Sequence, residues 1–274
     1  MSDAPPPGPP PRGARGPRRR LALVVSCEHG GARVPAAYRW LFRGAQAVLN
    51  THRGQDFGAL ELARDFARRL RALEAGRAAT RRRSSAEPPL FCSTVTRLLV
   101  ELNRSRRHPR LFSEFSRRLN VAQRRAVLTR YYEPYRAAVE QALRTRIRRA
   151  GRVLHLSVHT FTPVLAGSPR SADVGLLYDP ARPPERAFCA DWLVALRGAL
   201  PDMRVRRNYP YRGVADGFTT HLRRVFEPGE YLGIELEVSQ RIPAGPRREW
   251  SRIRGGLIRT FADAVSGSGA GAQP

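Results

Sequence analysis

Short apolar runs alternate with longer segments of helical periodicity along most of the chain. The runs have the length of β-strands, whereas in Phe57–Leu73 apolar residues recur every three or four positions, as on one face of a helix. The predicted strands are Leu21–Cys27, Thr96–Asn103, Val153–Thr160, Val174–Tyr178, Met203–Arg207 and Tyr231–Val238. The predicted helices are Phe57–Leu73, Val121–Arg149 with a bend before Pro134, Glu185–Leu200 and Arg248–Val265.

This alternation of strands and helices predicts the fold class. It favours an α/β protein with a mostly parallel sheet and helices on both faces, and no internal repeat is found. The first 20 residues are low-complexity Pro, Gly and Arg, and they are predicted to be disordered because they cannot bury a core. The tail 266–274 is interpreted in the same way, and Gly76–Pro89 is predicted to be an exposed loop or insertion.

Composition agrees with a folded, water-soluble chain. Hydrophobic residues make up 42% of the 274 residues, so a sizeable core can form. No apolar run approaches the roughly 20 residues that span a bilayer. Leu21–Val25 follows an Arg-rich start, but it is too short for the core of a signal peptide, and no cleavage site follows. We therefore expect a cytoplasmic protein.

The chain is strongly basic, with a formal charge of +26 and arginine as every one of its 49 basic residues. One interpretation is nucleic-acid binding through counterion release. The other, which we favour, is a general arginine bias with side chains on solvated faces, because no RNP, zinc-finger or helix-turn-helix pattern accompanies the charge. Nonspecific attraction of anions is expected in either case.

Three cysteines, Cys27, Cys92 and Cys189, lie far apart and form no CxxC. This pattern argues against a disulfide framework and against a zinc ribbon.

Reactive side chains follow several predicted strands. In α/β sheets, ligands bind beyond the carboxyl ends of the strands, so these residues are candidates for a common site. The candidates are Glu28 and His29 after the first strand, Asn103 and Arg104 after the second, His159 after the third, Glu235 and Glu237 on the last, and His52, Arg53 and Asp56 in the loop before Phe57.

Each candidate also has a structural interpretation. His29 could be a hydrogen-bonded residue at a strand end, and Asp56 stands where a helix N-cap belongs. His155, which shares a strand face with Ser157 and His159, is interpreted as a core residue. Arg104 could be one more surface arginine.

Glu235 and Glu237 point to one side of an apolar strand. A buried carboxylate is costly unless it is paired or coordinates a metal, so these two residues need partners. Arginines could supply them, and a structural ion pair therefore stays an alternative to a catalytic role.

Taken together, the candidates contain the parts of a catalytic zinc site. Such a site uses two imidazoles and a carboxylate with an open fourth position, a glutamate that takes a proton, and an arginine that holds an oxygen anion. His29, Asp56, His159, Glu237 and Arg104 could fill these roles, although no HExxH-type pattern exists. A second enzyme hypothesis uses Cys27 as a nucleophile paired with a histidine.

At these same residues the sequence resembles the N-formylglutamate amidohydrolase family, the zinc-dependent deformylases of histidine breakdown. The matching stretches run in order across about Leu21 to Arg259. They are SCEHGG, HRGQDFGALELA, LNRSRRHPRLFSE, HLSVHTFTP, ADVGLLYDP, RRNYPYRGVADGFTTHLRR and GIELEVSQ. The resemblance implies a three-layer, mixed α/β sheet like that of the zinc carboxypeptidases, formed by a single catalytic domain over 21–265. It also implies one zinc ion and hydrolysis of an N-acyl amide on an amino acid.

The resemblance also implies roles for individual residues. His29 and His159 are similar to the imidazole ligands and Asp56 to the carboxylate ligand, with Glu28 as the alternate. Glu237 is similar to the general base, with Glu235 as its alternate. Asn103 and Arg104 resemble a pair that grips the substrate carboxylate. Other plausible pocket residues in matching segments are Arg53, Tyr209, Arg212, Thr219 and His221.

Two residues depart from the family pattern: Glu101 stands where an aspartate is expected, and Ser239 where asparagine is commoner. Neither change touches the implied metal ligands. The sequence thus predicts a zinc-dependent hydrolase of an N-formyl or other small N-acyl amino acid, with N-formylglutamate as the expected substrate. The alternative is an inactive, basic member of the fold that binds nucleic acid or another polyanion.

Overall fold

The computed structural model describes residues 20–78 and 90–268, which form a mixed sheet covered by helices. The strands are β1 (Arg20–Cys27), β2 (Leu90–Cys92), β3 (Gly151–Phe161), β4 (Val164–Leu165), β5 (Ser168–Pro169), β6 (Val174–Leu177), β7 (Val205–Arg207) and β8 (Tyr231–Ser239). The α-helices are α1 (Gln46–Leu49), α2 (Ala59–Ala78), α3 (Val121–Val127), α4 (Glu133–Ala150), α5 (Pro183–Ala199), α6 (Phe218–Val225) and α7 (Arg247–Ser268). Shorter 3₁₀ or π turns are η1 (Ala36–Phe42), η2 (Ser116–Arg118) and η3 (Leu128–Tyr132).

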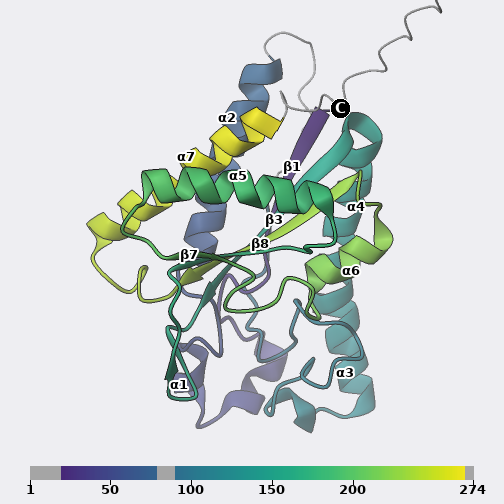
Figure 1. Cartoon of the computed structure of the whole chain (residues 1–274). Coiled ribbons are helices and arrows are strands. Elements are labelled where there is room, and N and C mark those ends of the chain that lie inside the picture. Colours follow the sequence, from purple (N-terminus) through teal and green to yellow (C-terminus); the bar gives the residue numbers. More distant parts are fainter. Residues whose placement is uncertain (1–19, 79–89, 269–274) are drawn as a thin grey trace, which may run out of the picture.

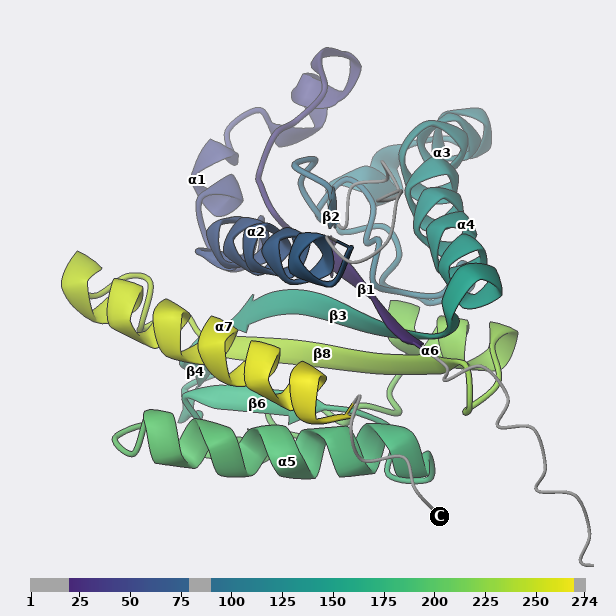
Figure 2. The same cartoon turned by 90° about the horizontal axis from the view of Figure 1, so that it is seen from above.

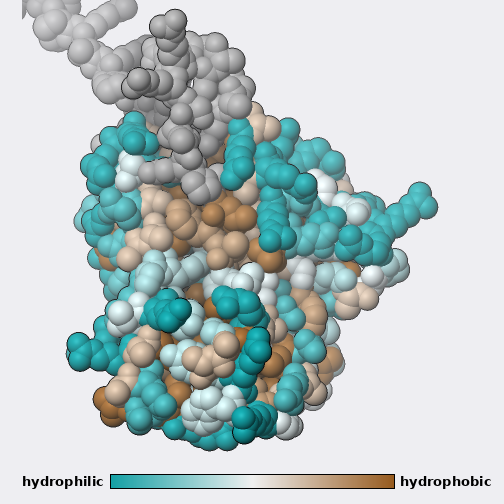
Figure 3. All heavy atoms as spheres, turned by 180° about the vertical axis from the view of Figure 1, so that it is seen from behind, coloured by the Kyte–Doolittle hydropathy of each residue, from teal (hydrophilic) through white to brown (hydrophobic). Residues whose placement is uncertain are grey.

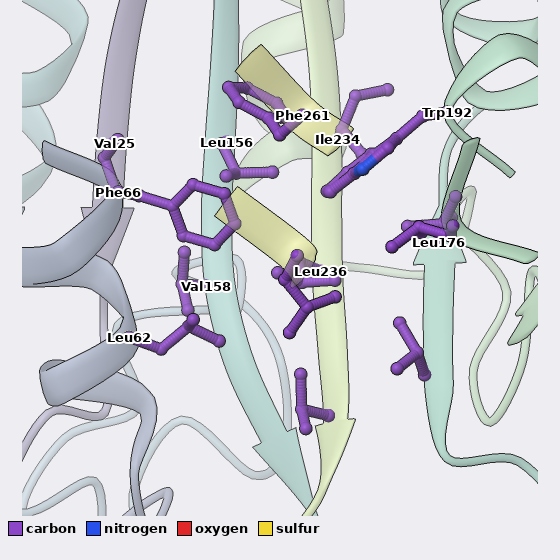
Figure 4. Packing of buried hydrophobic residues seen from close by; sticks show 14 of the residues in the cluster. Val25, Leu62, Phe66, Leu156, Val158, Leu176, Trp192, Ile234, Leu236 and Phe261 are labelled. Carbon is purple, nitrogen blue, oxygen red and sulfur yellow. The ribbon is translucent and has the colours of Figure 1, made fainter. Parts of the chain in front are cut away.

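Six strands form the main sheet in the order β2-β1-β3-β8-β6-β7. The four strands from β2 to β8 are parallel, whereas β6 runs antiparallel to β8 and carries β7 parallel to itself. Figure 4 shows this reversal directly, because the arrowheads of β3 and β8 point one way and that of β6 points the other. The parallel strands bring their carboxyl ends to one edge of the sheet.

Helices cover both faces of the sheet, which confirms the predicted three-layer α/β fold. Figures 1 and 2 show α2, α5 and α7 on one side of the central strands and α4 and α6 on the other. On the α2 side, Leu156, Val158, Ile234 and Leu236 of the sheet pack with Phe66 and other helical side chains in the largest buried cluster (Figure 4). β1 is a nearly continuous apolar run, whereas β3 and β8 alternate apolar with polar residues although both of their faces are buried. Both patterns are typical of strands, and this is why the sequence predicts these three well.

The prediction of a strand at Thr96–Asn103 is wrong. Those residues form turns, and the edge strand next to β1 is instead β2, which the sequence did not indicate. The apolar side chains of this segment, including Leu99 and Leu102, are buried in a second cluster with η1 and α3, outside the sheet. The segment 96–103 has the apolar composition of a strand, but its apolar side chains pack against helical turns and not within the sheet. The short helix α6 was also missed.

The helical segment changes its hydrogen-bonding pattern just before Pro134, where a bend is predicted. A π turn, η3, separates α3 from α4, and Pro134 lies in the first turn of α4. Asn120 and Gln123 form a capping box at the start of α3, and Gly151 ends α4 with a left-handed φ of 81°. The other predicted helices agree with α2, α5 and α7 to within a few residues.

The predicted terminal tails fall largely outside the described residues. Residue 20 already belongs to β1, and residues 266–268 belong to the end of α7. Of the predicted loop Gly76–Pro89, residues 76–78 complete α2 and the remainder is not described. In the described ranges, no helix has both the length and the apolar character needed to cross a bilayer.

Candidate functional site

Polar side chains gather where the parallel strands end. In β3, His155, Ser157 and His159 alternate with apolar residues and therefore share one face. Ser157 pairs in register with Glu235 of β8, and His159 pairs with Glu237. The pairing places these side chains next to one another on the α4 and α6 side of the sheet. All five residues are buried, which is unusual for so many polar groups.

His29, Asp56 and His159 come together at this edge. Each offers one donor atom, and the three atoms lie within 4.8 Å of one another. Oδ2 of Asp56 lies 3.2 Å from Nδ1 of His29 and 3.0 Å from Nδ1 of His159. The Asp56 backbone N–H also donates to the carbonyl of His29, which fixes the loop against the end of β1. The carboxylate of Asp56 faces the imidazoles and not the helix N-terminus, so its interpretation as a side-chain N-cap is wrong.

The outer nitrogens of both imidazoles contact carboxylates. Nε2 of His29 forms a hydrogen bond with Glu101, and Nε2 of His159 lies 3.1 Å from Oε2 of Glu28. A carboxylate on one ring nitrogen fixes the orientation of the ring and leaves the other nitrogen as an electron-pair donor. Both inner Nδ1 atoms face Asp56, so the three donors converge on one point.

Glu28 is fully engaged by its surroundings. Its Oε2 accepts the Ser157 hydroxyl at 2.7 Å, and its Oε1 accepts the Tyr135 hydroxyl of α4 at 3.0 Å. Burial alone would raise the pKa of Glu28, but the hydrogen bond and charge of His159 outweigh burial and hold this pKa well below its ordinary value. Each oxygen of the carboxylate thus already has a protein partner.

An arginine that the sequence did not single out ties the cluster together. Nη1 of Arg97 donates to Oδ1 of Asp56 at 3.1 Å, and Nε of Arg97 donates to Oε2 of Glu101 at 2.8 Å. Burial alone would raise the pKa of Glu101, but the charges of Arg97 and His29 outweigh burial, and the pKa lies below its ordinary value. Arg97 and Glu101 lie in the turns that were predicted as a strand, so no local pattern placed them at the site.

Glu237 differs from these carboxylates. Its Oε2 is buried and has no hydrogen-bond partner. Burial raises the pKa of Glu237 to about 8, the charges of Asp56 and Glu235 add to the shift, and His159 and Arg97 oppose it. Glu235 on the same strand face instead accepts the hydroxyl of Thr219. The two neighbouring glutamates are therefore in different states, one hydrogen-bonded and one without a partner.

Asn103 and Arg104 lie against the segment that enters α6. Oδ1 of Asn103 accepts the backbone N–H of Phe218 at 2.6 Å, and Arg104 donates to the carbonyl of Asp216. The Asn103 N–H donates to Glu101 at 3.0 Å, which links this pair to His29 through one carboxylate. The turn that contains Asn103 and Arg104 is thus connected by hydrogen bonds to His29, one of the metal-binding candidates.

The remaining predicted pocket residues are more scattered. Arg53 pairs with Glu114 at the surface, His221 lies 3.6 Å from Glu140 of α4, and Arg212 is exposed. The carbonyl of Tyr209 lies so close to Gly175, the register partner of Glu237, that a Cβ there would meet it at 1.9 Å. The structure therefore brings Tyr209, but not His221, to the end of the sheet beside Glu237.

Cys27 and His155 have buried surroundings. Burial and the charge of Glu28 raise the pKa of the Cys27 thiol well above its ordinary value, the opposite of what a nucleophilic thiolate needs. His155 is fully buried between the hydroxyls of Ser26 and Tyr231, at 2.8 and 2.9 Å, and burial lowers its pKa to about 4. Both are packing residues in this arrangement.

Comparison with known proteins places this site in a family. A gene product of Agrobacterium tumefaciens has the same fold with a TM-score of 0.70, at 25% identity over 91% of this chain and 92% of its own. An N-formylglutamate amidohydrolase of Ralstonia eutropha aligns over 92% of this chain and 96% of its own, with a TM-score of 0.59 and 17% identity, which shows a shared fold. Comparison with curated protein sequences finds no match.

The sequence profile described as N-formylglutamate amidohydrolase matches residues 21–242. The matched region begins in β1 and extends past β8, so it includes every residue of the cluster around His29, Asp56 and His159. Because the match covers well over half of the sequence, the chain belongs to the N-formylglutamate amidohydrolase family, and this membership supports hydrolysis of an amide bond.

Proposed function

We propose that the protein is a zinc-dependent hydrolase that cleaves the amide bond of an N-formyl or other small N-acyl amino acid, with N-formylglutamate as the first candidate. The observation that carries this proposal is the approach of His29, Asp56 and His159 to one point, beside the unpaired carboxyl of Glu237. Family membership supports the amide bond as the target.

The donor set fits zinc. Two imidazoles and one carboxylate are common ligands at catalytic zinc sites, where a fourth position stays open. We assign Asp56 and not Glu28 as the carboxylate ligand, because Tyr135 and Ser157 already occupy both oxygens of Glu28. Zinc held by this set would supply Lewis acidity toward the acyl oxygen and lower the pKa of a water molecule.

Glu237 is the proposed general base. It accepts a proton from the attacking water and passes it to the leaving nitrogen. Glu237 suits this role better than Glu235, whose carboxylate already accepts the Thr219 hydroxyl. Without a metal, the raised pKa keeps Glu237 protonated at neutral pH, and a cation on the neighbouring ligands would favour its charged form.

Asn103 and Arg104 are the proposed substrate-binding pair. Their contacts with Phe218 and Asp216 hold them in a fixed turn next to Glu101, which supports a preorganised role. In this role the pair grips a carboxylate of the substrate. Arg104 is in addition the proposed donor to the oxyanion that develops on the acyl group, where the loss of one donor typically costs about 10²- to 10³-fold in rate.

A hydrolysis screen with added zinc tests the proposal. N-formyl and other N-acyl amino acids are offered to the purified protein, and bound metal is measured in parallel. His159→Ala should lose both zinc and turnover, whereas His108→Ala, a histidine outside the cluster, should keep both. Stoichiometric zinc with full turnover in the His159 variant would contradict the ligand assignment. Absence of turnover across the panel would contradict the deformylase activity without affecting family membership.

A further inference from the structure

The connection between β3 and β6 crosses the end of β8. The chain leaves β3 at Phe161 and enters β6 at Val174, and β8 lies between these two strands. Because β6 runs antiparallel, Val174 pairs with Val238 near the carboxyl end of β8. The connecting segment, which contains the β4–β5 hairpin, therefore begins and ends next to the last residues of β8, where the carbonyls of Phe161 and Asp173 accept the N–H groups of Gln240 and Ser239.

Arg170 follows this hairpin and is fixed by backbone contacts on both sides. Its own N–H donates to the carbonyl of Pro163 at 2.8 Å, which closes the hairpin. The N–H of Ser171 donates to the hydroxyl of Tyr209 at 2.9 Å. Tyr209 in turn lies against Gly175, the register partner of Glu237. The position of Arg170 is thus determined relative to the proposed base.

Aromatic rings hold the guanidinium of Arg170. Its Cζ lies 4.9 Å from the ring centre of Tyr211 and 5.7 Å from that of Phe161, and Nη1 donates to the Tyr211 hydroxyl at 3.0 Å. Phe161 lies two residues after His159 in β3, so both side chains are on the same face. The cation therefore lies beside the end of β3 that carries His159, with its orientation fixed by the two rings.

Among the described residues, Arg170 pairs with no carboxylate. The nearest acid along the chain, Asp173, is occupied by Arg204 and Arg241. Arg53 pairs with Glu114, and Arg97 pairs with Asp56 and Glu101, so neither of these cations is similarly free. Burial and the charges of Arg53, Arg97 and Arg170 lower the pKa of His52, which indicates a positive electrostatic potential around His52.

We propose that Arg170, braced by Tyr211 and Phe161, binds a carboxylate of the amino-acid part of the substrate. A planar guanidinium whose charge has no protein counterion is suited to bidentate binding of a carboxylate. The inference rests on the proposed function, and it narrows the substrate class to N-acyl amino acids with at least one free carboxylate.

Arg170→Gln tests the inference with three substrates: N-formyl-L-glutamate, N-formyl-L-glutamine and the α-amide of N-formyl-L-glutamate. For N-formyl-L-glutamate, KM should rise about 10- to 100-fold, as expected when a charged hydrogen bond is lost, while kcat changes little. Each amide lacks one of the two carboxylates. For the amide that lacks the carboxylate bound by Arg170, KM of the variant should equal KM of the wild type, and this identifies the carboxylate. Tyr211→Phe should give a smaller rise in KM.

Arg144→Gln is the matched control, because Arg144 also stacks on a ring, that of Phe226 at 5.1 Å, but lies on α4 and pairs with Glu140. Its kinetics and the zinc content of all variants should equal those of the wild type. An unchanged KM in Arg170→Gln, or an equal loss with all three substrates, would overturn the inference.

If the wild type hydrolyses none of the three substrates, N-formylglutamate fails as the candidate substrate of the proposed function. In that case the affinities of the wild type and of Arg170→Gln for N-formyl-L-glutamate, measured by calorimetric titration, test the role of Arg170 without turnover. Binding that is weakened in Arg170→Gln supports the role of Arg170, and equal binding or no binding by the wild type overturns it.

Discussion

Buried carboxylates meet at the end of the sheet, and their neighbours put Asp56, Glu28, Glu101 and Glu237 in two classes. Asp56, Glu28 and Glu101 each face an imidazole. Burial alone would raise their pKa values, but these contacts, together with Arg97 in the case of Glu101, lower all three below the ordinary range. Glu237 has no such contact, and burial raises its pKa to about 8. The same residue type can therefore hold a ligand in place or exchange a proton, according to the groups it faces.

Glu237→Gln should change how stability depends on pH. The pKa of Glu237 rises from an ordinary 4.5 to about 8 on folding, so its favourable contribution is complete below pH 4.5 and is lost as the pH rises through 8. Glutamine does not titrate. In chelator-treated protein, the variant should therefore gain unfolding free energy relative to the wild type by on the order of 4 kcal/mol between about pH 5 and pH 9. Denaturant unfolding measures this difference, and a value independent of pH would argue against the raised pKa.

Glu101→Gln should weaken metal binding without unfolding the protein. The carboxylate of Glu101 orients the His29 ring, and loss of such a partner typically costs about 10- to 100-fold in metal affinity. Glu133→Gln, which removes a surface carboxylate paired with Arg106, is the control and should bind zinc like the wild type. Competition with a zinc-binding dye measures both affinities. Equal affinity in the two variants would show that Glu101 does not support the ligand.

At the scale of elements, the sequence predicts the buried centre of the fold better than its edges. β1 is an apolar run, and β3 and β8 carry an apolar residue at every second position, so these strands and the candidates His29 and His159 at their ends could be found without a structure. The turns around Glu101 could not, because their apolar residues are buried against helices outside the sheet and have the composition of a strand. Contacts such as Tyr135 with Glu28 join residues far apart in sequence, and only the fold brings them together.

Substitution of two glycines by alanine should have opposite effects on stability, because one glycine lies against a backbone carbonyl and the other has free space around it. In Gly175→Ala, the new Cβ would meet the carbonyl of Tyr209 at 1.9 Å, so the chain must shift, at a cost of at least about 2 kcal/mol. In Gly198→Ala, on α5, the Cβ would meet nothing within 4 Å, and alanine should stabilise the helix by up to about 1 kcal/mol. Thermal unfolding compares them, and similar shifts in Tm would contradict the assigned packing.

At the scale of the whole molecule, charge is the dominant property. The 49 arginines outnumber the 23 acidic residues, so the acids are too few to give every guanidinium a carboxylate of its own. Figure 3 shows hydrophilic side chains spread over the face seen from behind, interrupted by less polar residues. A distributed positive field of this kind attracts small anions toward the protein but does not select among them.

The kinetics of an anionic substrate should therefore depend on salt. As ionic strength rises from about 0.05 to 0.5 M, the Debye length shortens, and KM for N-formyl-L-glutamate should increase by up to about tenfold. KM for uncharged N-formylglycinamide should change far less, and kcat should be similar across the series. Parallel changes for both substrates would exclude electrostatic attraction as the cause.

The reversed strand β6 lets the chain return to the sheet without a crossover helix. Between β3 and β6 there is only a short excursion, whose tip residues Ala166 and Gly167 have φ values of 49° and 79° and lie in solvent. Its length can change without disturbing the register of β6 on β8 or the strand ends that carry His29 and His159. If Arg170 binds the substrate as proposed, the residues that set reactivity and the residue that sets selectivity lie in separate stretches of the sequence. A graft of this excursion from one relative to another would then change the substrate range while the cluster of His29, Asp56 and His159 stays as it is.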